Sequence, residues 1–155
     1  PSKREEDAGY DLYSNIEPRF LDGVAIYEQF LEKGTVNKIR TGIASSMSNK
    51  YFLSVKSERS SVAKLGINVL AGVIDSGYHG EIMVMVVPLV KDILITSEVD
   101  EVEEFDEIIH YPYNKAVAQG VLLPVPDVIV EEVTYDELLS KKTERGVGGF
   151  GSTEK

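Results

Sequence analysis

The chain has 155 residues, of which 43% are hydrophobic, and this size and composition suit one domain with its own core. It has no cysteine and only two histidines, which excludes disulfides and thiolate metal sites and leaves oxygen ligands for any metal. A net charge of −10 has the wrong sign for a general nucleic-acid binder, and the apolar runs are too short for a membrane span, so we expect a soluble, cytoplasmic protein.

Short apolar or alternating runs rich in β-branched residues recur between turn-forming residues, and they have the length and composition of strands. In chain order these runs are 37–46, 51–57, 67–75, 81–87, 91–97, 115–125 and 127–133. Many short strands separated by Gly, Pro and Asn predict an all-β fold, either a sandwich or a barrel.

Two further segments have the three- and four-residue spacing of a short amphipathic helix. The stronger example is 100–111, in which the apolar residues recur among acids. These apolar residues are Val102, Phe105, Ile108 and Ile109. The segment 25–33 allows the same interpretation. Short helices are therefore expected as additions to the β fold.

The end of the chain has a different composition. From the segment 134–142 onward the apolar content falls and the chain ends in glycines, so we expect a β domain over residues 1–140 and a flexible tail over residues 141–155. A disordered terminus would explain the glycines, but it does not require the arginine, aromatic and hydroxyl residues among them. Glycine amides can converge on an anion, and one aromatic ring can stack on a planar ligand. This composition indicates a lid for a nucleotide.

One turn-forming stretch combines an aspartate with glycines. Asp75 follows an apolar run and precedes the turn from Gly77 to Gly80, so a hairpin tip would hold its carboxylate rigidly. The alternative is an ordinary β-turn in which the aspartate accepts hydrogen bonds from nearby backbone amides. Tyr78, in the same turn, is by itself more typical of packing than of function.

Another stretch places an arginine beside two hydroxyls. Arg59, Ser60 and Ser61 offer guanidinium and hydroxyl donors that suit phosphate oxygens. The alternative is that a serine only caps a short helix that begins near Val62. Taken alone, Asp11 is interpreted as a turn aspartate and Gln119 as a polar residue at a strand edge.

Taken together, five stretches resemble the ordered motifs of the trimeric dUTP pyrophosphatases, or dUTPases. The stretches are "AGYDLYS" (8–14), "RSSVA" (59–63), "GVIDSGYHGEI" (72–82), "AVAQ" (116–119) and "RGVGGFGST" (145–153). Each is a weak signal alone, whereas the ordered set covers nearly the whole chain. The resemblance implies a jelly-roll or β-barrel subunit that hydrolyses dUTP to dUMP and pyrophosphate with Mg²⁺. This reaction limits uracil incorporation into DNA and supplies dUMP for thymidylate synthesis.

The resemblance also implies roles for individual residues. Asp75 matches the aspartate that activates the attacking water, and Asp11 matches the residue that organises the hydrated Mg²⁺, which the triphosphate itself chelates. Tyr78 matches the aromatic that packs on deoxyribose and leaves no room for a 2′-hydroxyl. The other positions that match substrate-binding residues are Arg59, Ser60, Ser61, Asn68, Gly72, Ile74, Met83, Gln119, Arg145, Phe150, Gly151, Ser152 and Thr153.

The family implies a homotrimer in which each active site combines motifs from different subunits. Two stretches look longer than usual, 20–34 and 98–110, and we interpret both as surface insertions. Two alternatives stay open: a dCTP deaminase, and a protein of this fold that uses its insertions to bind a partner. The deaminase needs a glutamate ten positions after the hairpin aspartate, and this chain has Met85 there.

Overall fold

The computed structural model describes residues 3–56, 60–144 and 146, although the side chains of Ser60 and Ser61 are not described. Contacts divide the chain into two units, Pro1–Val125 and Pro126–Lys155. The first unit contains the strands, and the second contains one short helix, α2 (Tyr135–Ser140). Among the described residues, no helix has the length and apolar character that crossing a bilayer requires.

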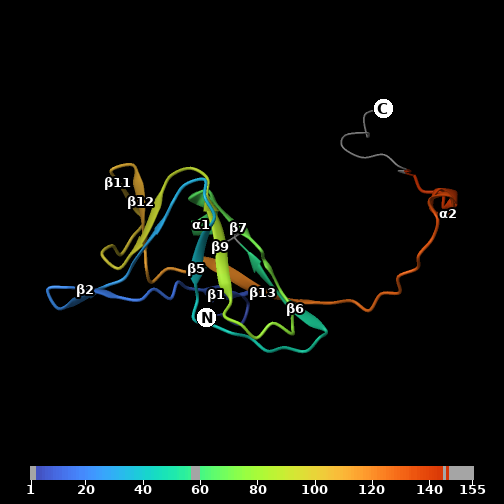
Figure 1. Cartoon of the computed structure of the whole chain (residues 1–155), viewed down its shortest axis with the longest axis horizontal. Helices are drawn as coiled ribbons and strands as arrows, with labels where there is room; N and C mark the ends of the chain where they lie inside the picture. Colours follow the sequence, from blue (N-terminus) through green and yellow to red (C-terminus); the bar gives the residue numbers. More distant parts are fainter. Residues whose placement is uncertain (1–2, 57–59, 145, 147–155) are drawn as a thin grey trace. The chain divides into compact units, whose positions relative to one another are not determined.

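The strands of the first unit form three sheets and one separate hairpin (Figure 1). The first sheet has the order β1 (Tyr10–Leu12), β13 (Ala118–Pro124), β6 (Tyr51–Lys56) and β8 (Val73–Ile74). The second has the order β11 (Glu103–Phe105), β12 (Ile108–Pro112), β10 (Ile93–Thr96) and β4 (Glu28–Leu31). The third has the order β5 (Asn37–Arg40), β9 (Met83–Pro88) and β7 (Ile67–Leu70). The hairpin is formed by β2 (Arg19–Leu21) and β3 (Val24–Ile26), and the helix α1 covers Ser60–Lys64.

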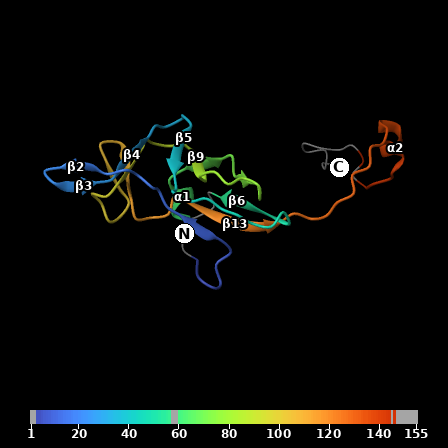
Figure 2. The same ribbon diagram turned by 60° about the horizontal axis from the view of Figure 1, so that its bottom comes forward.

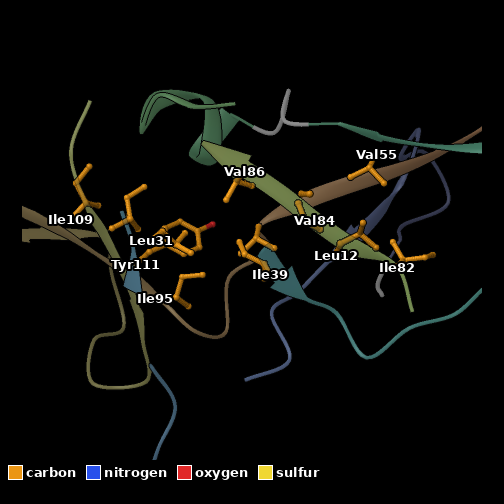
Figure 3. Close-up of a cluster of buried hydrophobic side chains, with 13 residues drawn as sticks. Leu12, Leu31, Ile39, Val55, Ile82, Val84, Val86, Ile95, Ile109 and Tyr111 are labelled. Atoms are coloured by element: carbon orange, nitrogen blue, oxygen red, sulfur yellow. The ribbon is translucent and has the colours of Figure 1, made fainter. Parts of the chain in front are cut away.

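One continuous core joins the three sheets. In Figure 3, Leu31, Ile95 and Tyr111 gather at one end of the cluster, while Leu12 and Val55 lie at the other. The middle is filled by side chains of the third sheet, because every second residue of β9 points inward. Burial of these apolar side chains is the main term that stabilises the fold. The prediction of an all-β class is confirmed.

The helix predicted over 100–111 is wrong. The structure places a hairpin there, with β11 and β12 joined by a turn at Asp106 and Glu107, both of which have positive φ. Of the four apolar residues that suggested a helix, only Ile109 is buried, and Phe105 is 64% exposed. Strand β12 pairs in parallel with β10, a long-range partner that local spacing does not reveal.

The helix interpretation of 25–33 is also wrong. This segment contains the end of β3 and the whole of β4, which pairs antiparallel with β10. Leu31 and Ile26 are buried because they lie on the inward side of these strands. Figure 2 shows β2 and β3 running out beyond β4 as a narrow ribbon, so the longer 20–34 stretch adds a hairpin.

The strand predicted over 127–133 is not formed within the described part of the chain. The segment has no secondary structure, and its apolar side chains face solvent, with Ile129 at 92% and Val130 at 86% exposure. A strand requires a hydrogen-bonding partner, which its own composition cannot supply. The following helix α2 is held by a capping box, in which Thr134 and Glu137 exchange hydrogen bonds.

Candidate active site

Three polar residues lie in one row across the first sheet. Asp11 on β1 is the direct partner of Gln119 on β13, which in turn is the partner of Lys56 on β6. Directly paired residues project from the same face of a sheet, so a carboxylate, an amide and an ammonium group share that face. The structure therefore brings Asp11 and Gln119 together, although they are far apart in the sequence.

Gly9 permits this close pairing of β1 with β13. A Cβ atom at this position would lie 2.7 Å from the backbone oxygen of Gly120 and 2.8 Å from the side chain of Gln119. Backbone cannot move aside without disturbing the strand, so only glycine fits here. The glycine that precedes Asp11 in the first motif thus has a packing reason.

The chain beyond β6 leads to the predicted phosphate-binding stretch. Ser60 begins α1, so a helix does start close to Val62 as the alternative interpretation expected. Arg59 lies outside the described residues. Because Lys56 is the last residue of β6, this stretch follows directly from the row of polar residues described above.

A polar hollow lies between β6, β7 and the start of β8. Its volume is about 300 Å³, and its lining residues are Ser54, Val55, Lys56, Asn68, Val69, Gly72 and Val73. Two of the predicted substrate-binding positions, Asn68 and Gly72, therefore line one hollow. Ile74, next to the lining residue Val73, pairs with Leu53 on β6, whereas Met83 does not line the hollow and pairs with Arg40 on β5.

Gly72, which lies between β7 and β8, contacts the backbone of β6. Its carbonyl oxygen accepts a 2.7 Å hydrogen bond from the N–H of Val55, and a Cβ atom on Gly72 would lie only 2.5 Å from the oxygen of Val55. Both groups belong to the backbone, so neither can rotate away. The glycine thus allows the contact that shapes the hollow.

We expect Gly72→Ala to lower the free energy of unfolding by about 1–3 kcal/mol, because overpacking against backbone forces the strands apart. Thermal denaturation measures this effect. Gly77→Ala, in the turn that follows β8, is a matched control, since no atom lies within 4 Å of the added Cβ. Equal melting temperatures for the two variants would contradict the steric argument.

Asp75 and Tyr78 form the turn that follows β8. The N–H of Tyr78 donates to the carbonyl oxygen of Asp75 at 3.0 Å, and the carboxylate of Asp75 is exposed. The Tyr78 ring is 44% exposed, and its hydroxyl donates to the carbonyl oxygen of Glu81 at 3.0 Å. The turn therefore exposes the Asp75 carboxylate to solvent and holds the half-exposed Tyr78 ring through its hydroxyl.

Sequence reasoning missed Glu81, which closes the same loop. Its carboxylate accepts a 2.9 Å hydrogen bond from the N–H of Gly42 and a 3.1 Å bond from Nε of Arg40. The hydrogen bond from the Gly42 N–H is the largest cause that lowers the pKa of Glu81 from its ordinary value; desolvation opposes it, and the hydrogen bond and charge of Arg40 add smaller lowering effects. The amino-acid sequence alone gave no signal for this contact, because Glu81 and Arg40 are brought together only by the pairing of β5 with β9.

This lowered pKa predicts a pH dependence. A carboxylate with a depressed folded-state pKa stabilises the fold above its unfolded value, here 4.5, and that contribution is lost as the pH falls through the folded-state pKa. We expect the melting temperature of Glu81→Gln to lie below that of the unmodified protein near pH 7, and the gap to narrow under acid conditions. Melting curves across this range test the prediction, and a gap that widens toward low pH would contradict it.

The described residues contain no cluster of three or more His, Cys, Asp or Glu side chains that could hold a metal ion. A single carboxylate beside an amide, as at Asp11 and Gln119, instead fits a hydrated Mg²⁺ whose other ligands come from phosphates and water. The predicted tail residues are outside the described part of the chain; they are Arg145, Phe150, Gly151, Ser152 and Thr153.

A family model described as dUTPase matches residues 1–99, which is more than half of the chain. The chain belongs to the dUTPase family. A relative in Nautilia profundicola, named deoxyuridine 5'-triphosphate nucleotidohydrolase, is 31% identical over 153 residues, which cover 97% of this chain and 87% of the relative. Because it covers 97% of this chain, this second match extends the likeness beyond residue 99.

Solved dUTPase structures have the same fold. The dUTPase of Staphylococcus bacteriophage 80alpha with dUpNHpp aligns with a TM-score of 0.69 at 20% identity, covering 98% of this chain and 89% of that chain. The dUTPase from phage phi11 of S. aureus, described with a structural Mg(II) ion, aligns with a TM-score of 0.61 at 20% identity, covering 88% of this chain and 90% of that chain. The all-β dUTPase fold predicted from the motifs is thus confirmed.

Proposed function

We propose that this chain hydrolyses dUTP to dUMP and pyrophosphate, with Asp75 as the residue that activates water. Membership of the dUTPase family supports the reaction. The observation that carries the residue assignment is the polar hollow lined by Asn68 and Gly72, because the strand that leaves it, β8, ends directly before Asp75. A base bound in the hollow would have its phosphates near the row of Asp11, Gln119 and Lys56.

The chemistry needs a positioned nucleophile more than covalent catalysis by the protein. Asp75 accepts a proton from a water molecule as the water oxygen bonds to the α-phosphorus. The bond from that phosphorus to the bridging oxygen breaks, and pyrophosphate leaves with the electron pair. Asp75 then releases the proton to solvent. An exposed carboxylate on a turn whose backbone is hydrogen-bonded suits this role, since it reaches water.

Mg²⁺ is the proposed cofactor. When bound, it neutralises charge on the phosphates. Asp11, beside Gln119 on the neighbouring strand, would hold the hydrated ion through water. The phage phi11 dUTPase, which is described with a structural Mg(II) ion, shows that a protein of this fold can bind Mg²⁺.

The remaining predicted contacts complete the proposal. Tyr78 would exclude ribose, and Arg59 with Ser60, Ser61 and Gln119 would bind the phosphates. Arg145 would reach the terminal phosphate, and Phe150 would stack on uracil when the tail closes, with Gly151, Ser152 and Thr153 adding contacts. We place these tail residues in a substrate-ordered clasp over residues 141–155, distinct from the β domain.

We also propose a homotrimer with shared active sites. Two apolar surfaces of this chain support association with further copies. The segment 127–133 exposes Val128, Ile129 and Val130 without a strand partner. The first unit has an apolar hollow of about 300 Å³ lined by residues such as Tyr10, Leu53 and Leu122. Light scattering at working concentration should give three times the chain mass, and a monomer mass would remove the shared-site proposal.

The proposed function is tested by pyrophosphate release from dUTP, dTTP, dCTP and UTP with Mg²⁺. We expect strong preference for dUTP. The deaminase alternative predicts ammonia release from dCTP, but Met85 lies on β9 at the position where that reaction needs a carboxylate. Comparable turnover of dCTP, or ammonia release from it, would overturn the proposal.

A further inference from the structure

The ring of Tyr78 is held by the backbone of the two residues that end its loop. Its hydroxyl donates to the carbonyl oxygen of Glu81, and it lies so close to Gly80 that a Cβ atom there would be 2.6 Å from the hydroxyl oxygen. The position of the ring therefore depends on where the backbone of Gly80 and Glu81 lies.

That backbone is fixed by contacts with the end of β5 and the residues that follow it. The Glu81 side chain accepts from Gly42 and Arg40, as described above. The N–H of Ile82 donates to the carbonyl oxygen of Ile43 at 2.8 Å, next to the hydroxyl of Thr41, which donates to the carbonyl oxygen of Ile82. Of these contacts, only those of Glu81 are made by a side chain of the loop itself.

The backbone N–H of Gly42, which donates to the Glu81 carboxylate, is also held in a defined position. Gly42 has a φ of 67°, a conformation that glycine adopts without strain. The side chain of Glu81 is 22% exposed and that of Arg40 is 51% exposed, so the bond from the Gly42 N–H is the more sheltered part of the contact. A carboxylate that accepts a backbone N–H and a guanidinium N–H together has a fixed orientation.

We infer that Glu81 is a positioning residue for sugar selection, since it holds the backbone that keeps the Tyr78 ring against deoxyribose and so excludes a 2′-hydroxyl. This inference rests on the proposed function. Glu81 does not touch the substrate; it acts through Tyr78. Loosening the loop gives the ring room to retreat, which admits ribose and weakens the packing on deoxyribose.

The experiment compares kcat/KM for dUTP and for UTP. We expect Glu81→Ala to lower the preference for dUTP by roughly tenfold, through a higher KM for dUTP and a relative gain for UTP. Glu81→Gln should recover most of the preference, because its amide oxygen can still accept from Gly42. Glu104→Ala is the matched control. It removes a carboxylate of β11, in the second sheet, that pairs with Lys91, and it should leave the preference for dUTP unchanged.

A double-mutant cycle separates positioning from a general loss of stability. Tyr78→Phe removes the hydroxyl bond to Glu81 and should lower the preference by itself. Combined with Glu81→Ala it should lower the preference little further, since both changes release the same ring. Additive losses would overturn the inference.

Other outcomes decide the question as well. An unchanged preference in folded Glu81→Ala, or an equal fall in kcat for both substrates, would overturn the role of Glu81 while leaving the proposed function intact. If Glu81→Ala does not fold, Arg40→Ala removes one donor and should lower the preference by a few fold, and no change would overturn the inference. Unmodified protein that does not prefer dUTP would overturn both proposals before any variant is compared.

Discussion

Asp75→Asn is expected to reduce dUTP turnover by about 10²–10⁴-fold, the range that general-base catalysis contributes. The amide keeps the size and planarity of the carboxylate but cannot accept the proton of the attacking water. The turn should persist, because Tyr78 donates to the backbone oxygen of Asp75 and not to its side chain. Steady-state pyrophosphate release measures the loss.

Nucleotide binding separates loss of chemistry from loss of the site. Calorimetric titration with a non-hydrolysable dUTP analogue should give affinities for Asp75→Asn within about tenfold of the unmodified protein. Asp22→Asn is a matched control, since Asp22 is in the turn between β2 and β3 and has no proposed part in catalysis. Near-normal turnover of Asp75→Asn, or loss of its fold, would contradict the assigned role.

Deleting the chain from Gly146 onward should lower kcat/KM for dUTP by roughly 10²-fold or more, because the closed site loses the glycine amides and the aromatic ring. The melting temperature should change little, since the deleted residues include only Val147 and Phe150 as large apolar side chains. Activity assays and thermal denaturation of the truncated protein test both parts.

Phe150→Ala isolates one contact of the proposed clasp. It should weaken binding or turnover by about 1–3 kcal/mol if stacking on uracil is similar to aromatic stacking on single-stranded bases. Limited proteolysis at Lys141 or Arg145 gives an independent readout, with slower cleavage expected when a dUTP analogue and Mg²⁺ are present. Full activity of the truncated protein together with equal cleavage rates would show that the tail has no such role.

Local composition predicted the class of the fold correctly but not the type of every element. The runs 51–57 and 81–87 became β6 and β9, because their β-branched and aromatic residues favour strands, and in β9 every second residue also points into the core. The helix prediction for 100–111 failed because part of the segment pairs as β12 with β10, a partner strand that local spacing does not identify. The strand prediction for 127–133 failed for the opposite reason, since a segment with the composition of a strand forms none when it has no partner strand.

By itself the sequence determined the family and the candidate chemistry, because the order of the motifs and the residue types in them can be identified without knowing how the chain folds. Only the tertiary structure decided which of those residues meet. Asp11 and Gln119 become neighbours through the pairing of β1 with β13, and Glu81 reaches Gly42 through the pairing of β5 with β9. Such contacts depend on strand register, which is set by burial of the whole core and not by the residues that make the contact.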